Sequence, residues 1–207
     1  MAARPANPKL ADDILRVTAE IVEEKGPERL ALNEVATRLG YTRPTIYLYY
    51  KNKDELLQAT IDRSFETFAD LQDAAAEGLP PASALRRRVA AYLDWGIEHP
   101  GMYRLMFEHP AEKPVDPARA AARRRWLERD RALLAEVIDG VDGADAASLD
   151  LVEPGLWAIA HGLVSLIISG RLFGPLGRAI GIDEAKARAQ QIIASTLILP
   201  ADEEATR

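Results

Sequence analysis

The sequence predicts an all-α fold with two parts, a small N-terminal bundle of three helices and a larger C-terminal helical domain. Apolar residues recur at the spacing of one helix face along most of the chain, and no segment alternates as a strand would. The 207 residues are 48% hydrophobic and 28% charged, which is typical of a soluble globular protein with its own core. Because the chain has no cysteine, disulfides, thiolate nucleophiles and cysteine zinc sites are excluded.

The first four helices each have a recognisable start or stop in the sequence. Their expected ranges are about 9–25, 35–39, 43–49 and 52–68. The Gly26-Pro27 pair stops the first helix, and Gly40 suits a left-handed C-cap at the end of the second. Thr42 is expected to cap the third helix, and Asn52 with Glu55 has the spacing of a capping box that opens the fourth.

Five further helices are expected in the C-terminal half. Their ranges are about 83–98, 102–107, 118–139, 154–173 and 183–199. Ser83 is a candidate N-cap for the first of them, and Gly140 with Gly143 closes the third. The loop between the second and third is marked by three prolines, Pro110, Pro114 and Pro117.

The helix expected over about 154–173 is apolar nearly all round. Its apolar stretch, Leu156–Ile168, is interrupted by His161 and is too short to cross a bilayer. We therefore expect a buried helix covered on all sides and no membrane span. The first nine residues hold no apolar run that would make a secretory signal or anchor, so a cytoplasmic protein is expected.

Charge is distributed unevenly along the chain. The whole sequence has a net charge of -6, yet residues 29–53 hold five Lys and Arg against a single acid, Glu34, for a local charge of +4. A basic segment inside an acidic chain indicates a partner for that segment alone.

The second and third helices, joined by a short turn within this basic segment, form a candidate helix-turn-helix. In that geometry the second helix of the motif lies in the DNA major groove. The residues it would offer to base edges are Arg43, Pro44, Thr45 and Tyr47. Those placed to meet phosphates where the chain leaves the groove are Tyr49, Lys51 and Lys53. The alternative is that these are solvated charges on a helical bundle.

The run Leu39–Leu57 strongly resembles the signature of TetR-family transcriptional regulators, and the resemblance covers about residues 9–60. It implies an N-terminal helix-turn-helix DNA-binding domain, residues 1–55, and a C-terminal helical effector-binding and dimerisation domain, residues 56–207. It also implies a homodimer that binds double-stranded operator DNA and a small-molecule effector, with repression as the family default.

Two residues depart from the family pattern. Ala31 stands where the family usually has Thr or Ser at the start of the second helix, which weakens that cap by ~1 kcal/mol if nothing replaces it. Asn33 stands where several members carry a base-contacting residue. Its amide could bond adenine, or it could serve as a substitute cap, and both remain open.

The C-terminal half resembles the WHG type of TetR C-terminal domain, through Trp157, His161 and Gly162 and through the segment 99–107. Aromatic and apolar side chains there could line an effector pocket with few polar groups, although each one alone is as often core. The expected pocket residues are Trp95, Met102, Tyr103, Met106, Phe107, Trp126, Trp157 and His161.

Small residues form a stripe along the apolar helix and a comparable face on the last helix. Small side chains let another helix approach closely, so this stripe is expected to pair with its copy in a homodimer. The expected interface residues are Gly155, Ala158, Gly162, Ser165, Ser169, Ala189 and Ile193. Ordinary packing within the chain is the alternative.

Signatures of catalysis are missing from the sequence. We find no phosphate loop and no nucleophile with a base and an orienting acid, and the three histidines lack metal-ligand spacing. No catalytic residue, cofactor or metal is therefore expected. A helical small-molecule carrier or lyase without DNA binding is the alternative function, and salt-dependent binding to duplex DNA would distinguish the two.

Overall fold

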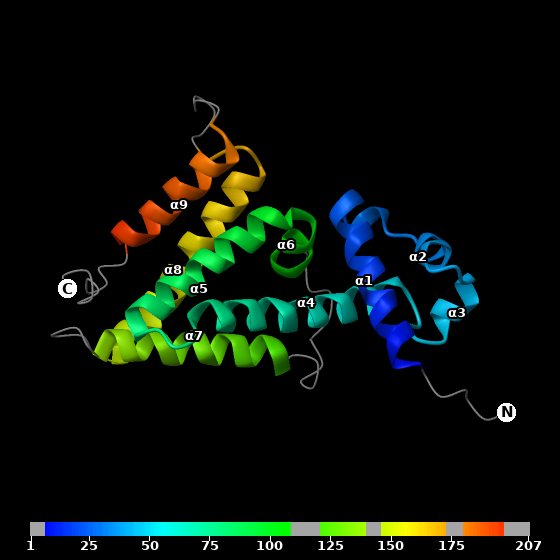
Figure 1. Cartoon of the computed structure of the whole chain (residues 1–207), viewed down its shortest axis with the longest axis horizontal. Helices are drawn as coiled ribbons and strands as arrows, with labels where there is room; N and C mark the ends of the chain where they lie inside the picture. Colours follow the sequence, from blue (N-terminus) through cyan, green and yellow to red (C-terminus); the bar gives the residue numbers. More distant parts are fainter. Residues whose placement is uncertain (1–6, 109–120, 140–145, 173–179, 197–207) are drawn as a thin grey trace. The chain divides into compact units, whose positions relative to one another are not determined.

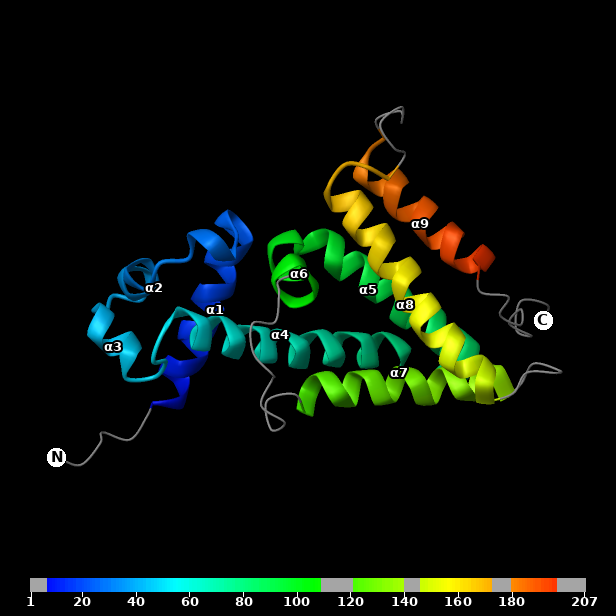
Figure 2. The same ribbon diagram turned by 180° about the vertical axis from the view of Figure 1, so that it is seen from behind.

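The computed structural model describes residues 7–108, 121–139, 146–172 and 180–196, and the predicted all-α fold is confirmed over them. Every regular element in these ranges is helical (Figures 1 and 2). The elements are α1 (Pro8–Lys25), a 3₁₀ turn (Pro27–Arg29), α2 (Leu32–Arg38), α3 (Arg43–Tyr47), α4 (Lys53–Ala76), α5 (Pro81–Glu98), α6 (Pro100–Phe107), α7 (Ala121–Asp139), α8 (Ala146–Ile168) and α9 (Ile182–Thr196).

The chain divides into two compact units, and α4 contributes residues to both. The first unit comprises residues 1–67 and 99–123, and the second comprises residues 68–98 and 124–207. Helix α6 therefore packs with the N-terminal helices although it follows α5 in the sequence. The functional boundary at residues 55 and 56 stays a prediction.

Helix α1 organises the first unit by contacting α2 and α6. It begins at Asn7, whose side-chain oxygen accepts a hydrogen bond from the backbone of Lys9, and its buried face includes Ile14 and Ile21. The predicted stop at Gly26 is confirmed, since this residue ends α1 with a positive φ of 82°.

The N-terminus of α6 is docked directly onto α1. The carboxylate of Glu23 accepts hydrogen bonds from the backbone N–H groups of Gly101 and Met102, at 3.1 and 3.0 Å. A Cβ on Gly101 would lie 2.6 Å from the carbonyl oxygen of Val22, so only glycine permits this approach. The Glu23 side chain thus satisfies two of the N–H groups that a helix start leaves without partners.

The turn between α2 and α3 is closed by a Schellman motif. Gly40 adopts φ of 72°, as the sequence predicts, and its N–H donates to Thr37 O at 3.1 Å. The N–H of Tyr41 donates to Ala36 O at 2.8 Å, which completes the motif. This fixed turn holds α3 against α2, and Ile46 of α3 is fully buried.

The predicted capping box at the start of α4 is confirmed in its main bond. The side-chain oxygen of Asn52 accepts from the Glu55 N–H at 2.8 Å. The Glu55 carboxylate reaches back to the N–H of Lys51, one residue before the cap, at 2.7 Å. Both bonds tie the end of the α3 segment to α4.

The second unit is built from α5, α8 and α9, which contact one another, together with α7 and the C-terminal part of α4. An aromatic cluster joins α7 and the C-terminal part of α4 to α5. Phe68 of α4 lies with its ring centre 5.6 Å from Tyr92, 4.9 Å from Trp95 and 5.7 Å from Trp126. Figures 1 and 2 both show α8 and α9 side by side.

Several predicted helix boundaries and caps need correction, among them the start of α2 at Leu32 and the end of α4 at Ala76. Helix α3 ends at Tyr47 and not at residue 49, and Thr42 sits at its N-cap without a side-chain bond to the helix backbone. Helix α5 begins at Pro81, so Ser83 lies inside it. Proline is well suited to a first helical position, because the N–H it lacks would have no partner there.

Helix α8 begins eight residues before Pro154, which lies in its interior. The turn before the proline is tied to α7, because Asp150 and Glu153 both pair with Arg131, although a proline within a helix lacks an N–H and clashes locally. The predicted features outside the described residues are the loop prolines Pro110, Pro114 and Pro117, the Gly140 and Gly143 stop, Phe173 and residues 197–199.

Helix α8 is not covered on all sides, contrary to the sequence prediction. Within the described chain it contains one segment long and apolar enough to cross a membrane, Leu149–Ile168, with mean hydropathy 1.7 and 22% of that window buried. Leu151 is 78% exposed and Leu166 is 41% exposed. The single chain therefore leaves much of this apolar helix in contact with solvent.

Candidate nucleic-acid interface and effector cavity

Helix α3 presents a polar face to solvent and an apolar face to the first unit. Arg43, Pro44 and Tyr47 are exposed, Thr45 is half-buried, and Ile46 between them is fully buried. The predicted base-contacting residues of α3 thus share one surface, and the anchor predicted on the opposite side packs inward.

Arg43 and Tyr47 are paired across one turn of α3. The Arg43 guanidinium donates to the Tyr47 hydroxyl oxygen from Nε at 3.2 Å and from Nη2 at 2.7 Å, and its carbon lies 5.3 Å from the ring centre. Two of the five guanidinium N–H groups are used in these bonds. The other guanidinium N–H groups of Arg43 are available to donate to base acceptors, while Tyr47 holds the arginine side chain in one orientation.

The three predicted phosphate contacts differ in their surroundings. The side chain of Lys51 is exposed, and Tyr49 is half-buried with its hydroxyl oxygen accepting the N–H of Asn7 at 3.1 Å. Lys53 is half-buried and donates from Nζ to the carbonyl oxygen of Glu28 at 2.9 Å. This bond gives Lys53 a structural role that its charge and position alone did not indicate.

Ala31 occupies the N-cap of α2 without a side-chain bond, as its residue type requires. Asn33 is exposed in the first turn of α2, and among the described residues its amide makes no bond that would replace the cap. Of the two alternatives for Asn33, capping is therefore not what the structure shows. Base contact by its exposed amide stays a prediction.

An ion-pair network fixes α2 against α1. Arg38 binds Glu24 of α1 at 2.6 Å and Glu34 of its own helix at 2.8 Å, and Lys25 binds Glu34 at 2.6 Å. Hydrogen bonding from Arg38 holds the pKa of Glu24 below its usual value, and Lys25 followed by Arg38 does the same for the pKa of Glu34. This network neutralises Arg38, which leaves Arg43 and Lys51 as the exposed cations around α3.

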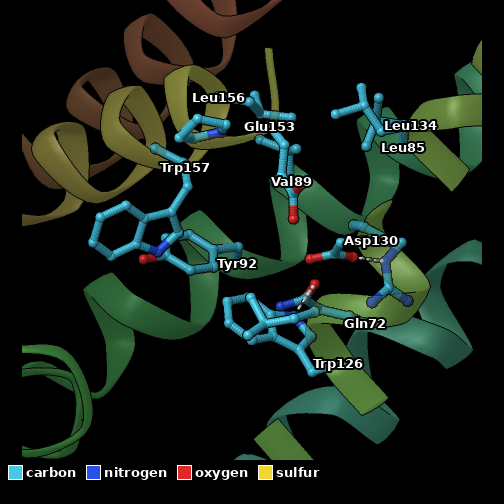
Figure 3. Close-up of a pocket in the computed structure, with 14 residues that line it drawn as sticks. Gln72, Leu85, Val89, Tyr92, Trp126, Asp130, Leu134, Glu153, Leu156 and Trp157 are labelled. Atoms are coloured by element: carbon cyan, nitrogen blue, oxygen red, sulfur yellow. Dashed lines mark hydrogen bonds and ion pairs between the residues drawn. The ribbon is translucent and has the colours of Figure 1, made fainter. Parts of the chain in front are cut away.

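A cavity of about 350 Å³ lies within the second unit, between side chains of α4, α5, α7 and α8. Its aromatic walls are Tyr92, Trp126 and Trp157, and aliphatic side chains such as Leu85 and Leu134 complete them. In Figure 3 the polar side chains of Gln72 and Asp130 lie near Trp126. The cavity is therefore mostly apolar with one polar end.

A buried arginine organises the polar end. Arg88 donates from Nε to Asp130 at 2.6 Å and from Nη1 to Asp73 at 2.5 Å, and Asp73 also pairs with Arg129. Burial raises the pKa of Asp130 despite the attraction of Arg88. At the rim, Arg131 pairs with Glu153 and Asp150.

Two of the eight predicted pocket residues, Trp126 and Trp157, line this cavity. Trp95 packs on Phe68, and His161 stacks on Trp157 with ring centres 5.0 Å apart, but neither is among the lining residues. The other four lie on α6 in the first unit, where Met102, Tyr103 and Met106 are buried and Phe107 packs against Tyr103 and Phe65.

The small-residue stripe of α8 is open in the single chain. Ala158 and Ser169 are exposed, Gly155, Gly162 and Ser165 are half-buried, and a Cβ added to either glycine would meet nothing within 4 Å. The α9 part of the prediction needs correction. Ala189 and Ile193 are 0% and 4% exposed, because this face of the helix packs within the chain.

Models of two known domain families match the chain. Residues 14–60 match the bacterial regulatory proteins of the tetR family, and residues 85–189, more than half of the chain, match the tetracyclin repressor-like C-terminal domain. The chain belongs to the TetR family. It is a transcriptional regulator with a DNA-binding helix-turn-helix and not an enzyme, and the C-terminal match is consistent with the WHG-type resemblance.

Two relatives of this TetR-family protein are themselves transcriptional regulators. An uncharacterised regulator of Mycobacterium tuberculosis is 28% identical over 171 residues, which cover 81% of this chain and 74% of that protein. The transcriptional activator FasR of Mycolicibacterium smegmatis is 26% identical over 149 residues, 71% of this chain and 67% of that one.

Solved structures share the fold. A TetR-like regulator of Rhodococcus has a TM-score of 0.64 at 19% identity, with 94% of this chain and 98% of that chain covered. A protein from Saccharomonospora viridis, solved in complex with choline, has a TM-score of 0.69 at 17% identity, with 94% and 100% covered.

The cavity of this TetR-family protein includes polar residues that the sequence analysis missed, above all Gln72, Arg88 and Asp130. One signal was present: Arg88 lies within the apolar stripe of α5, three residues after Leu85 and four before Tyr92. A charged residue on a buried helix face is expected to have a buried partner. The partners themselves, on α4 and α7, follow no sequence pattern that would identify them.

Proposed function

We propose that this chain is a ligand-responsive repressor that binds operator DNA as a homodimer in the cytoplasm and is released by a small apolar or aromatic effector. Repression is the family default, although FasR, one of its relatives, is an activator. Three features support the proposal: the polar face of α3, the open stripe of α8 and the cavity of the second unit.

The observation that carries DNA reading is the exposed Arg43 held by Tyr47 on a helix whose other face is fully buried at Ile46. Because the buried face fixes the orientation of α3, the residues on its exposed face would enter the DNA major groove in a single register. Arg43 can bond two guanine acceptors, and Pro44 with the methyl of Thr45 can contact a thymine methyl. Asn33, Tyr49 and Lys51 would add base and phosphate contacts around them.

The α8 stripe supports a homodimer. Leu151, Gly155, Ala158, Gly162 and Leu166 recur along one line of the helix, and none of them is buried in the single chain. Two-fold pairing of α8 with its copy along this line would cover the exposed leucines. It would also give the dimer two copies of α3, one for each half-site of an operator. Ser165 and Ser169 lie beside the same line.

The cavity supports an effector because its aromatic walls and small polar end have the character of a small-molecule site. An effector shifts DNA affinity only if it binds the DNA-competent and incompetent conformations differently. We propose that α4 is the element the two states share, since it begins beside the helix-turn-helix and its C-terminal part supplies Gln72 to the cavity.

Duplex fragments retained by the purified protein from sheared DNA identify the operator and test DNA reading. Arg43→Ala is expected to weaken binding to the retained site by ~1–3 kcal/mol and to relax base preference at one position. Arg188→Ala removes an exposed arginine of α9 and should bind as the unaltered chain does. Wild-type affinity and selectivity in a folded Arg43→Ala variant would contradict the proposal that α3 reads the operator.

A further inference from the structure

The polar end of the cavity contains two hydrogen-bond donors that have no acceptor among the described residues. They are Nε2 of Gln72 and Nη2 of Arg88, and both side chains line the cavity. Gln72 is 1% exposed and Arg88 is 4% exposed. A buried donor without a partner is costly and rare in native proteins, so each such atom calls for an explanation.

The orientation of the Gln72 amide is fixed by its neighbour. The indole N–H of Trp126 donates to Gln72 Oε1 at 3.3 Å. Because an indole nitrogen only donates, the amide oxygen must face Trp126 and the amide NH₂ must face away from it. Rotating the amide by half a turn would set two donors against each other.

The guanidinium of Arg88 is bound on two of its three nitrogens. Nε and Nη1 bind the carboxylates of Asp130 and Asp73, which hold the group in place and balance its charge. Nη2 then remains as a fixed donor beside the cavity. Arg129, the second cation on Asp73, leaves this cluster of two arginines and two aspartates electrically neutral.

We propose that the cavity recognises a neutral, mainly apolar aromatic molecule that carries a carbonyl oxygen, and that Gln72 Nε2, the donor whose direction Trp126 sets, donates a hydrogen bond to that oxygen. The aromatic walls of Tyr92, Trp126 and Trp157 contact the rest of the molecule. The amide nitrogen is not exposed, so the oxygen reaches it as side chains at that end move apart.

The neutral cluster selects against charged ligands. A ligand carboxylate would lie beside Asp73 and Asp130 with no unbalanced cation to offset their repulsion. A quaternary ammonium ion, such as the choline bound by the S. viridis protein, suits aromatic walls but offers no acceptor to the two donors. A carbonyl accepts from the Gln72 amide without adding charge.

The test uses four naphthalenes substituted at the same ring position and titrated by calorimetry into the full-length protein. They carry an acetyl, an ethyl, a carboxylate or a trimethylammoniomethyl group. Acetylnaphthalene is expected to bind about tenfold more tightly than ethylnaphthalene, the factor that a net gain of one or two hydrogen bonds gives. The carboxylate and the ammonium compound should bind more weakly than the ketone.

Gln72→Glu keeps an oxygen for the Trp126 indole and replaces the amide NH₂ by a carboxyl group. Burial beside Asp130 favours the protonated carboxyl, which could still donate, so the titrations are repeated at alkaline pH, where the carboxyl is ionised and cannot donate. In this variant the ketone should lose its advantage, while ethylnaphthalene binds as before and shows that the cavity is intact. Gln190→Glu makes the same change at an exposed position of α9 and should bind all four compounds like the unaltered chain.

Equal affinity for the acetyl and ethyl compounds, stronger binding of either charged compound, or no binding of any compound would overturn the proposal. It rests on the proposed effector cavity but can fail separately from the regulatory function. A chain that binds its operator and shows no ketone preference refutes only the ligand class. A chain that prefers the ketone and binds no duplex refutes the proposed DNA reading and leaves the ligand class standing.

Discussion

Two lysines of the basic segment, two residues apart, are expected to act differently. The side chain of Lys51 is exposed and is proposed to contact DNA phosphates, whereas Lys53 is half-buried and bonded to the carbonyl of Glu28. Lys51→Ala should therefore weaken binding to all duplexes alike and reduce its salt dependence, with unchanged thermal stability. Lys53→Ala should also lower the free energy of unfolding by about 1 kcal/mol.

Urea denaturation of both variants, together with duplex titrations at two salt concentrations, measures these effects. The comparison is informative because both substitutions remove one lysine charge. Equal stability of the two variants would show that the bond from Lys53 to Glu28 contributes nothing to the fold.

Gly101 is required where α6 meets α1. Gly101→Ala would place a methyl group 2.6 Å from Val22 O and 2.7 Å from Glu23 Cα, and backbone atoms cannot move aside as a flexible side chain would. We expect a loss of ~1–3 kcal/mol in the free energy of unfolding, measured in urea.

Gly155→Ala is the matched control for this prediction. A methyl group there meets nothing within 4 Å, and alanine favours a helix over glycine by roughly 0.5–1 kcal/mol. If the two variants were equally stable, the close approach of α6 to α1 would not be a constraint.

At the scale of elements, the ion pairs between α1 and α2 make stability depend on pH. In the folded chain the pKa values of Glu24 and Glu34 are lowered from 4.5. The two ionised carboxylates therefore stabilise the fold above pH 4.5, and this stabilisation is lost as pH falls through the lowered pKa values. Arg38→Gln should reduce the melting temperature at neutral pH, and this difference should shrink below pH 4.5.

Arg16→Gln provides the comparison, because Arg16 pairs only with Asp13 and Glu20 of its own helix in the bonds described. Exposed pairs within one helix contribute little, so its melting temperature should stay near that of the unaltered chain. A constant effect of Arg38→Gln across the acid range would exclude a role for the carboxylates.

Elements with a local chemical cause could be predicted from the sequence, and those decided by distant packing could not. Gly40 and the Asn52–Glu55 box place their own helix ends through bonds to nearby backbone, and both predictions were correct. Pro154 was taken as a helix start, yet it lies inside α8, where Asp150 and Glu153 of the preceding turns pair with Arg131 of α7, a partner distant in sequence.

The same distinction separates the two functional sites. The proposed DNA-contacting residues of α3 lie within one short segment, so their exposure could be predicted from the turn and from helix periodicity. The polar end of the cavity joins residues far apart in sequence, such as Arg88 and Asp130, which are 42 positions apart. Likewise, the predicted pocket placed α6 beside α5, whereas α6 belongs to the other compact unit.

At the scale of the whole molecule, the open stripe of α8 gives a direct test of assembly. A Cβ added at Gly162 meets nothing within 4 Å in the single chain, so Gly162→Leu is expected to leave the fold intact. A loss of assembly would therefore come from the partner copy, at a cost of ~1–3 kcal/mol for overpacking a fitted contact. Mass measured by light scattering should fall from two chains toward one, and operator affinity should fall with it.

Ala132→Leu adds the same bulk to an exposed position of α7 and should leave both mass and operator affinity unchanged. A Gly162→Leu variant that remains a full-strength dimer would place the interface elsewhere.

If the exposed leucines of α8 are covered only in the proposed dimer, DNA binding depends on the cellular concentration of the protein. In the proposed homodimer, pairing of two chains is a second-order process, so the population of DNA-competent dimers would rise with the square of chain concentration while dimers are the minor species. Below a threshold copy number the operator would stay empty even without effector. Above it, occupancy would increase steeply, which gives the response a sharp dependence on abundance in addition to its dependence on ligand.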